Sequence, residues 1–201
     1  MKMKSKTFLI FRHGQTDWNL EKRCQGHTDI PLNSHGRNEA LELALRLKNY
    51  PIEVIYSSDL SRALETARLV AAESDLMIIE TPLLRETHMG EAEGLTINEI
   101  TRKFGEKFWH NFRFMNEEAM NLGFPGGETR AQSLKRLKGF VESLLEIDEE
   151  VIALSTHGGS LRSLLHSFLP DGSESLAIPN CVVYELKFEA GKWSVKGPLT
   201  D

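Results

Sequence analysis

Short apolar runs alternate with helical patterns along most of this chain, and this alternation narrows the choice of folds more than any other feature. The apolar runs lie at residues 8–11, 54–56, 76–79 and 151–154. Between them, apolar residues recur at the spacing of one helix face, as Ala40, Leu43, Ala44 and Leu47 do. Strands that alternate with helices predict a mostly parallel sheet with helices on both faces. We therefore expect an α/β fold built as a three-layer sandwich.

The rest of the chain supplies two further strands and an insertion. Residues 182–188 and 192–195 are predicted to be strands joined by a tight turn at 190–191. Residues 97–120 have an irregular, mostly helical pattern rich in Phe, Trp and Met, and the Pro and paired Gly of 124–128 predict a loop. We expect residues 1–201 to form a single domain. Within it, residues 95–128 would be a lid-like helical insertion over the sheet edge and the active site.

Composition excludes several classes of partner. The chain has 201 residues and a formal net charge of −5, whereas nucleic-acid-binding proteins normally present a strongly basic face. No apolar run approaches the length of a membrane span. The two cysteines, Cys24 and Cys181, are too few for the disulfide framework of a small secreted domain, which favours a reducing, cytoplasmic location. We therefore expect no nucleic-acid and no membrane partner, and leave a homodimer open.

Charged and titratable residues stand where the predicted strands end. The first strand runs into Arg12 and His13, the second leads to Arg62, the third to Glu86, and the fourth ends at His157. Ligands of open parallel sheets bind at the carboxyl ends of the strands. We therefore expect these five side chains to surround one pocket.

This set of side chains suits phosphoryl transfer. Guanidinium groups bind phosphoryl oxygens with forked, charge-assisted hydrogen bonds. A neutral imidazole is a competent nucleophile near neutral pH, and its covalent adduct splits one hard step into two easier ones. A carboxylic acid can protonate the departing oxygen and then take a proton from the attacking water. Glu86 is the candidate acid, with Glu91 and Glu93 as nearby competitors, and Gly14 is expected to let the backbone approach the ligand.

Five motifs in order extend the pattern over most of the chain. They are residues 12–19 (RHGQTDWN), residues 57–67 (SSDLSRALETA), Glu86 with Gly90 and residues 93–94, residues 125–128 (PGGE) and residues 156–159 (THGG). On these motifs the chain resembles the histidine phosphatase superfamily, also called the phosphoglycerate mutase-like family, from residue 8 to about residue 188. Within it, the chain is similar to the broad-specificity phosphatases and the alpha-ribazole phosphatases.

The resemblance implies roles for individual residues. His13 would be phosphorylated, Arg12, Arg62 and His157 would hold the phosphoryl group, and Glu86 would donate the proton. Substrate-binding positions would be Asn19, Gln25, Gly26 and Gly158. No metal and no organic cofactor is implied. Ala92 stands where many phosphatases of the family have an aromatic residue, so the pocket wall beside the acid is expected to differ.

These observations predict a phosphoric monoester hydrolase that acts on a small phosphorylated metabolite. One alternative is a cofactor-dependent phosphoglycerate mutase. Mutases resemble one another in having a longer chain and an arginine pair after a Trp of the insertion, whereas here Trp109 is followed by His-Asn-Phe-Arg. The other alternative is a non-catalytic phosphate-binding module, which the complete set of core residues disfavours. The identity of the substrate is beyond what the sequence determines.

Other residues receive structural interpretations. Cys24 is expected to be a small buried apolar residue near the pocket mouth. Lys135, Arg136 and Lys138 are expected to form a solvated helix face, and residues 57–59 to cap the helix that follows them. Five further histidines lack the spacing of metal ligands: His27, His35, His88, His110 and His166. Among them, His88 is a candidate pocket neighbour. Whether one of Phe108, Trp109, Phe112 and Phe114 touches substrate stays open.

Overall fold

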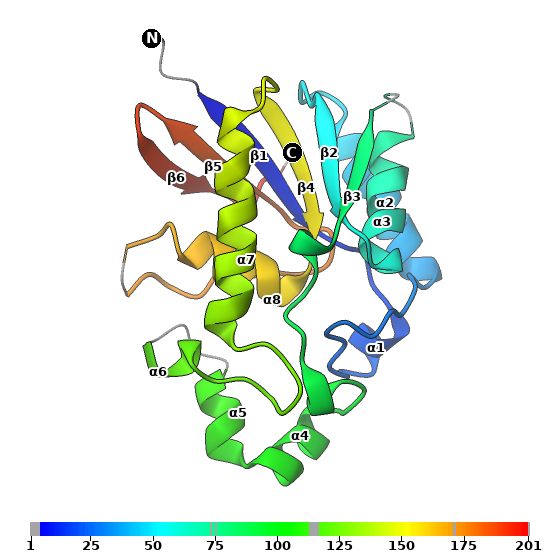
Figure 1. The fold of residues 1–201 in the computed structure, drawn as a ribbon. Coiled ribbons are helices and arrows are strands. Elements are labelled where there is room, and N and C mark those ends of the chain that lie inside the picture. Colours follow the sequence, from blue (N-terminus) through cyan, green and yellow to red (C-terminus); the bar gives the residue numbers. More distant parts are fainter. Residues whose placement is uncertain (1–4, 73, 75, 113–116, 171, 201) are drawn as a thin grey trace.

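The computed structural model describes residues 5–72, 74, 76–112, 117–170 and 172–200, and in this part of the chain six strands form one sheet (Figure 1). The strands are β1 (Lys6–Arg12), β2 (Val54–Ser58), β3 (Ile78–Thr81), β4 (Val151–Thr156), β5 (Val183–Glu189) and β6 (Lys192–Lys196). Their order across the sheet is β3-β2-β4-β1-β5-β6. The first four strands pair in parallel, whereas β5 and β6 are antiparallel to their neighbours.

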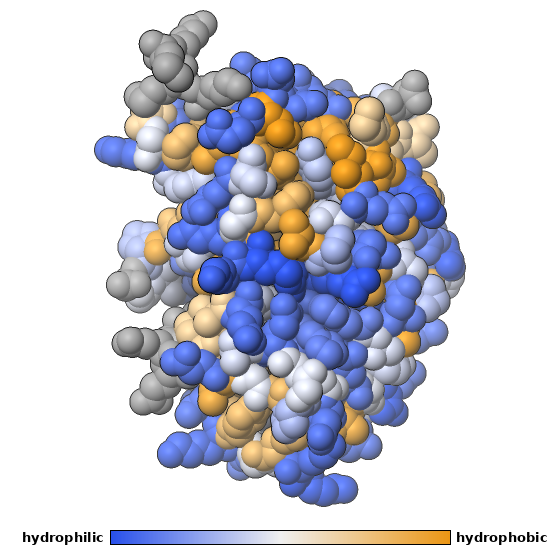
Figure 2. Space-filling model, viewed as in Figure 1, coloured by the Kyte–Doolittle hydropathy of each residue, from blue (hydrophilic) through white to orange (hydrophobic). Residues whose placement is uncertain are grey.

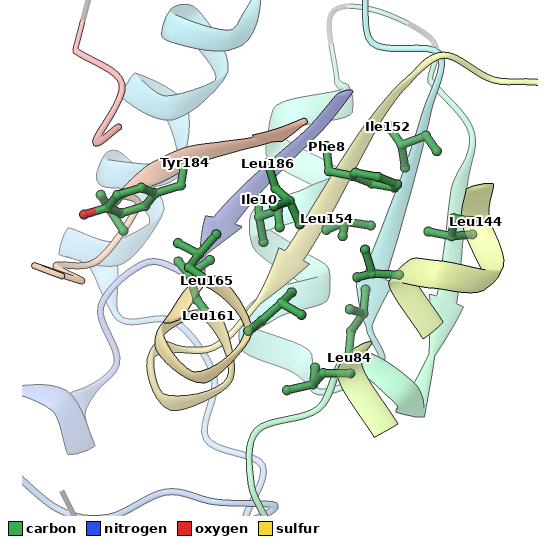
Figure 3. Packing of buried hydrophobic residues seen from close by; sticks show 14 of the residues in the cluster. Phe8, Ile10, Leu84, Leu144, Ile152, Leu154, Leu161, Leu165, Tyr184 and Leu186 are labelled. Carbon is green, nitrogen blue, oxygen red and sulfur yellow. The ribbon is translucent and has the colours of Figure 1, made fainter. Parts of the chain in front are cut away.

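Helices cover both faces of the sheet. On one face lie α2 (Ser34–Leu47) and α3 (Ser61–Ala71), and on the other α7 (Arg130–Ser143) and α8 (Gly158–His166) (Figure 1). Side chains of a strand point alternately to its two faces. Accordingly, Phe8 and Ile10 of β1 join the core under α7 and α8, which Figure 3 shows, whereas Leu9 and Phe11 join the core under α2 and α3. The predicted three-layer α/β fold is confirmed.

The segment predicted as an insertion lies beyond the carboxyl ends of β1 and β4 (Figure 1). It contains α4 (Ile97–Phe104), α5 (Glu106–Phe112) and α6 (Glu117–Met120). A small core of its own includes Ile100, Phe112 and Phe124. α4 is followed by Gly105, whose φ of 94° is a backbone conformation that other residues rarely adopt. In the described ranges, no helix is both long enough and apolar enough to cross a bilayer.

The remaining helices are single turns in the loops around the sheet. They are α1 (Asp17–Leu20), η1 (Pro82–Leu84), η2 (Gly90–Ala92) and η3 (Leu144–Glu146). α1 follows the loop after β1, and a capping box between Thr16 and Asn19 starts it. The sequence pattern did not predict α1, because a single turn is too short to show a helical period.

The third strand differs from its prediction. Residues 76–79 were expected, whereas β3 spans Ile78–Thr81. Its bounds follow from pairing with β2, since Ile55 pairs with Ile78 and Ser58 with Thr81. Met77 is 67% exposed, so the apolar run does not coincide with a buried element. The reason is that β3 is an edge strand, whose bounds depend on its partner more than on its own apolar residues.

The expected capping of α3 by residues 57–59 is wrong. Leu60 is the N-cap and makes no side-chain capping bond, and Asp59 instead binds Arg85, with oxygen–nitrogen distances of 2.7 and 2.6 Å. The carboxylate of Asp29, from a loop 32 residues earlier, accepts hydrogen bonds of 2.8 Å from both the amide and the hydroxyl of Ser61. A distant carboxylate thus supplies the acceptor that the helix N-terminus needs.

Candidate active site

A cavity of about 290 Å³ lies where the strands end and the insertion begins. It is lined by Arg12, His13, Asn19, Arg23, Cys24, Gln25, Gly26, Arg62, Glu86, Thr87, Met89, Phe112, Arg130, Gly158, Gly159, Arg162 and Ile178. On the face drawn in Figure 2, strongly hydrophilic residues cross the middle of the molecule at this same level. The volume is close to the lower end of the range for ligand pockets.

His13 follows β1 and is 3% exposed. Its Nδ1 lies 2.7 Å from the carbonyl oxygen of Gly14. Because a carbonyl can only accept, Nδ1 carries the proton and Nε2 keeps its lone pair. Burial and then the charges of Arg62 and Arg12 hold the pKa of His13 well below its usual 6.5. The ring is therefore neutral at physiological pH and presents an unprotonated nitrogen.

His157 follows β4, is fully buried, and lies with its ring centre 5.1 Å from that of His13. Its Nδ1 accepts a hydrogen bond of 3.2 Å from Nε of Arg62, so its Nε2 carries the proton and donates to the hydroxyl of Ser58 at 2.8 Å. Both ring nitrogens thus have protein partners. The structure brings His157 to the site, but it is not one of the cavity-lining residues.

Arg62 and Arg12 present guanidinium groups to the cavity. Besides His157, Arg62 donates to the carbonyls of Thr28 at 3.0 Å and Gly26 at 2.8 Å. These three bonds use three of its five N–H groups, which leaves two for a ligand. Burial lowers the pKa of Arg62 to about 10, so it stays charged at neutral pH. Arg12 donates through Nη1 to the carbonyl of Ile178 at 2.7 Å, and its Nε is buried without a partner in the described structure.

Glu86 is held by the N-terminus of α8. Its Oε2 accepts from the amide of Gly159 at 2.8 Å, and its Oε1 accepts from the amide of Ser160 at 2.8 Å and from the Ser160 hydroxyl at 3.0 Å. The amide of Thr87 adds a fourth bond at 2.9 Å. These bonds fix a carboxylate on the cavity wall, close to the residues that surround His13.

Glu91 and Glu93, the two other candidates for the proton donor, make contacts outside the cavity. Glu93 accepts hydrogen bonds from the amides of His27 and Thr28, both at 2.8 Å, and so holds that loop. Glu91 forms an ion pair of 2.9 Å with Lys103. Neither lines the cavity, whereas Glu86 does.

The predicted substrate-binding positions Asn19, Gln25, Gly26 and Gly158 all line the cavity. The reason for glycine at position 14 differs from the one expected. A Cβ on Gly14 would lie 2.3 Å from the carbonyl oxygen of Gly36 at the start of α2. The glycine therefore allows the loop to pack against α2, and Gly14 is not on the cavity wall.

Comparison with known proteins decides the family. Residues 8–198 match the model of the histidine phosphatase superfamily (branch 1). The chain belongs to this superfamily. It is 34% identical over 196 residues to Phosphoglycerate mutase-like protein 4 of Arabidopsis thaliana, a match that covers 94% of this chain and 82% of the relative. It is 29% identical over 190 residues to the uncharacterized phosphatase PhoE of Bacillus subtilis, with 93% and 91% covered.

A solved structure has the same fold. It is a mycobacterial glucosyl-3-phosphoglycerate phosphatase in complex with VO3, which superimposes with a TM-score of 0.83 at 27% identity and covers 96% of this chain and 98% of that one. The names of these relatives include phosphatases and a phosphoglycerate mutase-like protein. This superfamily member is accordingly a phosphatase or a phosphoglycerate mutase-like protein.

Several lining residues of this superfamily member were not predicted. Arg23, Arg130 and Arg162 come from three separate segments, and no strand end marks them. Phe112 lines the cavity, so one member of the aromatic cluster reaches the site, and Phe114 lies outside the described residues. Cys24 is half-buried, lines the cavity and also packs against the small core of the insertion. In the described ranges, no group of three or more His, Cys, Asp and Glu side chains could hold a metal ion.

The expectation of a solvated helix face is wrong for Arg136. Its guanidinium forms a 2.8 Å ion pair with Glu128 and donates to the carbonyls of Leu83 and Arg85 at 2.8 and 3.1 Å. These carbonyls belong to the loop that leads to Glu86. Arg136 therefore satisfies the backbone of that loop, which its position on α7 alone could not reveal.

Proposed function

We propose that this chain is a phosphatase that hydrolyses small phosphomonoesters through a phosphohistidine on His13. The observation that carries the proposal is the unprotonated Nε2 of His13 in a cavity that Arg12, Arg62 and Glu86 also line. His13 is the nucleophile, the two arginines bind the phosphoryl oxygens, and Glu86 moves the proton. His157 positions Arg62 through their hydrogen bond.

The first step forms the phosphohistidine. The lone pair of His13 Nε2 bonds to phosphorus while the bond from phosphorus to the leaving oxygen breaks. Glu86, in its acid form, gives its proton to that oxygen, so that an alcohol departs instead of an alkoxide. The N–H groups of Arg62 and Arg12 that the protein does not use bind the phosphoryl oxygens through both steps.

The second step returns the enzyme to its starting state. A water oxygen attacks phosphorus, the phosphorus–nitrogen bond breaks, and its electron pair returns to Nε2 of His13. The Glu86 carboxylate takes the proton of the water, and phosphate leaves. Between the two steps Glu86 is ionised, and a carboxylate suits the four hydrogen bonds that its oxygens accept. Since the arginines supply the positive charge, we expect activity without added metal and in the presence of a chelator.

We also propose that residues 1–201 act as one domain in which residues 95–128 cover the substrate. Phe112 of α5 lines the cavity, and its carbonyl accepts a 2.7 Å hydrogen bond from Arg130 of α7. This bond links the insertion to the helix that begins beside the site. A covered cavity of about 290 Å³ favours small metabolites over phosphoproteins.

The alternative function is a cofactor-dependent phosphoglycerate mutase, which returns the phosphoryl group to the substrate instead of transferring it to water. A relative named phosphoglycerate mutase-like shares 34% identity with the chain, and this keeps the alternative in place. The two activities separate when 3-phosphoglycerate is supplied with 2,3-bisphosphoglycerate. Formation of the 2-isomer would favour the mutase, and release of phosphate the phosphatase.

The proposal is tested by release of phosphate from an aryl phosphate by the wild type and by His13→Ala. We expect the substitution to lower kcat by at least about 10³-fold, because no other group can form the covalent adduct. His35→Ala is the matched control, since the His35 side chain is 64% exposed and lies outside the cavity. Retained activity in His13→Ala, with wild-type activity in the control, would overturn the proposal.

A further inference from the structure

Two arginines of the cavity have no task in the proposed reaction. We propose that Arg130 and Arg162 form a subsite for a second anionic group of the substrate. The preferred substrate would then carry a carboxylate or a second phosphate beside the phosphoryl group that reacts. This inference rests on the proposed phosphatase function and deepens it by naming a substrate class.

Arg130 is built into the site more deeply than a surface arginine would be. It is the first residue of α7 and is 8% exposed. Its Nη1 donates to the carbonyl of Phe112 at 2.7 Å, and its guanidinium carbon lies 5.0 Å from the centre of the Phe112 ring. Its Nε is buried without a partner, and no described carboxylate lies within 4.0 Å of it. A charged group so placed is costly unless a ligand pairs with it.

Arg162 adds a second cation to the same end of the cavity. It lies on α8, which packs against α7, and its Nε is also buried without a partner among the described residues. Burial lowers the pKa of Arg130, Glu86 raises it, and repulsion from Arg162 lowers it again. Both side chains line the cavity and come from helices that pack against each other, and an anion bound by both would offset the repulsion between their charges.

The charges of the cavity point to more than one anionic group. Its described lining residues include the arginines 12, 23, 62, 130 and 162 but Glu86 as the single carboxylate. Arg23 is paired with Glu21 at 2.6 Å, and the proposed reaction uses Arg12 and Arg62 for the phosphoryl group. Two cations remain for a second group. Because Arg130 binds the carbonyl of Phe112, this subsite lies on the insertion side of the cavity.

The test compares substrates that differ only in the second group. Glycerol 3-phosphate and 3-phosphoglycerate have the same number of carbons, but one ends in a hydroxymethyl group and the other in a carboxylate. We expect the wild type to favour 3-phosphoglycerate by at least about 10-fold in kcat/KM, the effect of one or two charge-assisted hydrogen bonds. Propane-1,3-diol bisphosphate and its monophosphate form a second pair. Comparing the kcat/KM ratio of this pair with that of the first shows whether the subsite prefers a phosphate or a carboxylate.

Arg130→Met and Arg162→Met should each bring the ratio of kcat/KM for 3-phosphoglycerate to kcat/KM for glycerol 3-phosphate close to one, whatever their effect on the two separate values. Arg68→Met is the matched control, because the Arg68 side chain is 64% exposed and lies outside the cavity. Arg162→Met keeps the test valid if Arg130→Met fails to fold, and Arg130→Lys should retain part of the preference. A preference that survives both Met variants would overturn the subsite.

Failure of the subsite and failure of the reaction are distinguishable. If the wild type hydrolyses both members of a pair equally, the subsite is wrong and the phosphatase proposal stands. If it hydrolyses none of these esters, the affinity of the two compounds for His13→Ala is compared by calorimetry. The subsite would still be supported if the compound with the second anionic group binds more tightly and if adding Arg130→Met to His13→Ala removes that difference. Equal binding of the two compounds to His13→Ala would overturn the subsite.

Discussion

One hydrogen bond determines which nitrogen of His13 can react. Because Nδ1 donates to the Gly14 carbonyl at 2.7 Å, the lone pair is on Nε2. Burial and the neighbouring charges of Arg62 and Arg12 lower the pKa of the ring, so Nε2 is not readily protonated as the pH falls. His157 is kept neutral by the same causes, burial first and then Arg62. The proposed nucleophile is therefore prepared by residues that do not react themselves.

We expect His13 and His157 to stay neutral between pH 7.5 and pH 6.0, where an ordinary histidine with a pKa of about 6.5 gains a proton. The unfolded chain binds protons in this window that the fold excludes, so the free energy of unfolding should decrease as the pH falls below about 6.5. Ring ¹⁵N chemical shifts, measured by NMR across this range, report the charge directly. Imidazolium shifts for His13 at pH 6.0 would contradict this account.

At the residue scale, the strand pattern and the family motifs together predicted most of the site, and they missed Arg130 and Arg162, which lie outside both. Arg12, His13 and Glu86 meet because the carboxyl ends of parallel strands share one edge of the sheet. Arg130 and Arg162 lie on helices, where an arginine is usually solvated, and nothing in the sequence shows that they are turned inward. Their contribution to the cavity became visible only in the packed structure.

Among the elements, α8 has the most direct influence on the proposed chemistry. Its first turn supplies the amides of Gly159 and Ser160 that hold Glu86. The N-terminus of a helix carries unpaired N–H groups and partial positive charge, which suits a carboxylate. The position of the proposed proton donor therefore depends on how closely this turn approaches it.

Replacing Gly159 by Ala should displace the proton donor. A Cβ there would lie 2.7 Å from Oε1 of Glu86, which forces the carboxylate to move. We expect kcat for alkyl phosphates to fall by about 10- to 100-fold and kcat for aryl phosphates, whose leaving groups need less protonation, to fall less.

Gly139→Ala is the matched control, because a Cβ on that helical glycine of α7 meets nothing within 4 Å. Glu86→Gln should reproduce the dependence on the leaving group. Equal losses for alkyl and aryl phosphates in Gly159→Ala would contradict the role of Glu86 as acid.

At the scale of elements, the sequence predicted the buried strands well and the short or exposed elements poorly. β1 and β4 are apolar on both faces, so their runs stand out from their surroundings. β3 is an edge strand with two exposed residues, and its pattern placed it two residues too early. The acceptor at the start of α3 comes from Asp29, and a contact across 32 residues leaves no local signal.

At the scale of the whole molecule, a separate hydrophobic core covers each face of the sheet, and the cavity lies at the carboxyl ends of the parallel strands. Leu154 of β4 is fully buried and belongs to the core under α7 and α8 (Figure 3). Strands β1 and β2 pair on either side of β4, so packing around this strand supports both Arg12, at the end of β1, and Arg62, in the helix α3 that follows β2. Stability and the geometry of the site thus depend on the same central strands.

Leu154→Ala should lower the free energy of unfolding by about 2–5 kcal/mol, because it removes buried methyl groups and leaves a cavity. Urea unfolding followed by circular dichroism measures the change. Leu41→Ala, at a leucine that is 49% exposed, is the control and should cost less than about 1 kcal/mol. Equal effects of the two substitutions would show that β4 is not central to the core.

The most direct test of the central claim is to trap the adduct on His13. In Glu86→Gln, an aryl phosphate should still phosphorylate the enzyme, while attack by water is slowed because its base is gone. Mass spectrometry of protein quenched during turnover should show one added HPO₃ group on the peptide that contains His13. The amount of this adduct should match the burst of phenol released from the aryl phosphate. A burst with no adduct on His13, or with the group on another residue, would contradict the account.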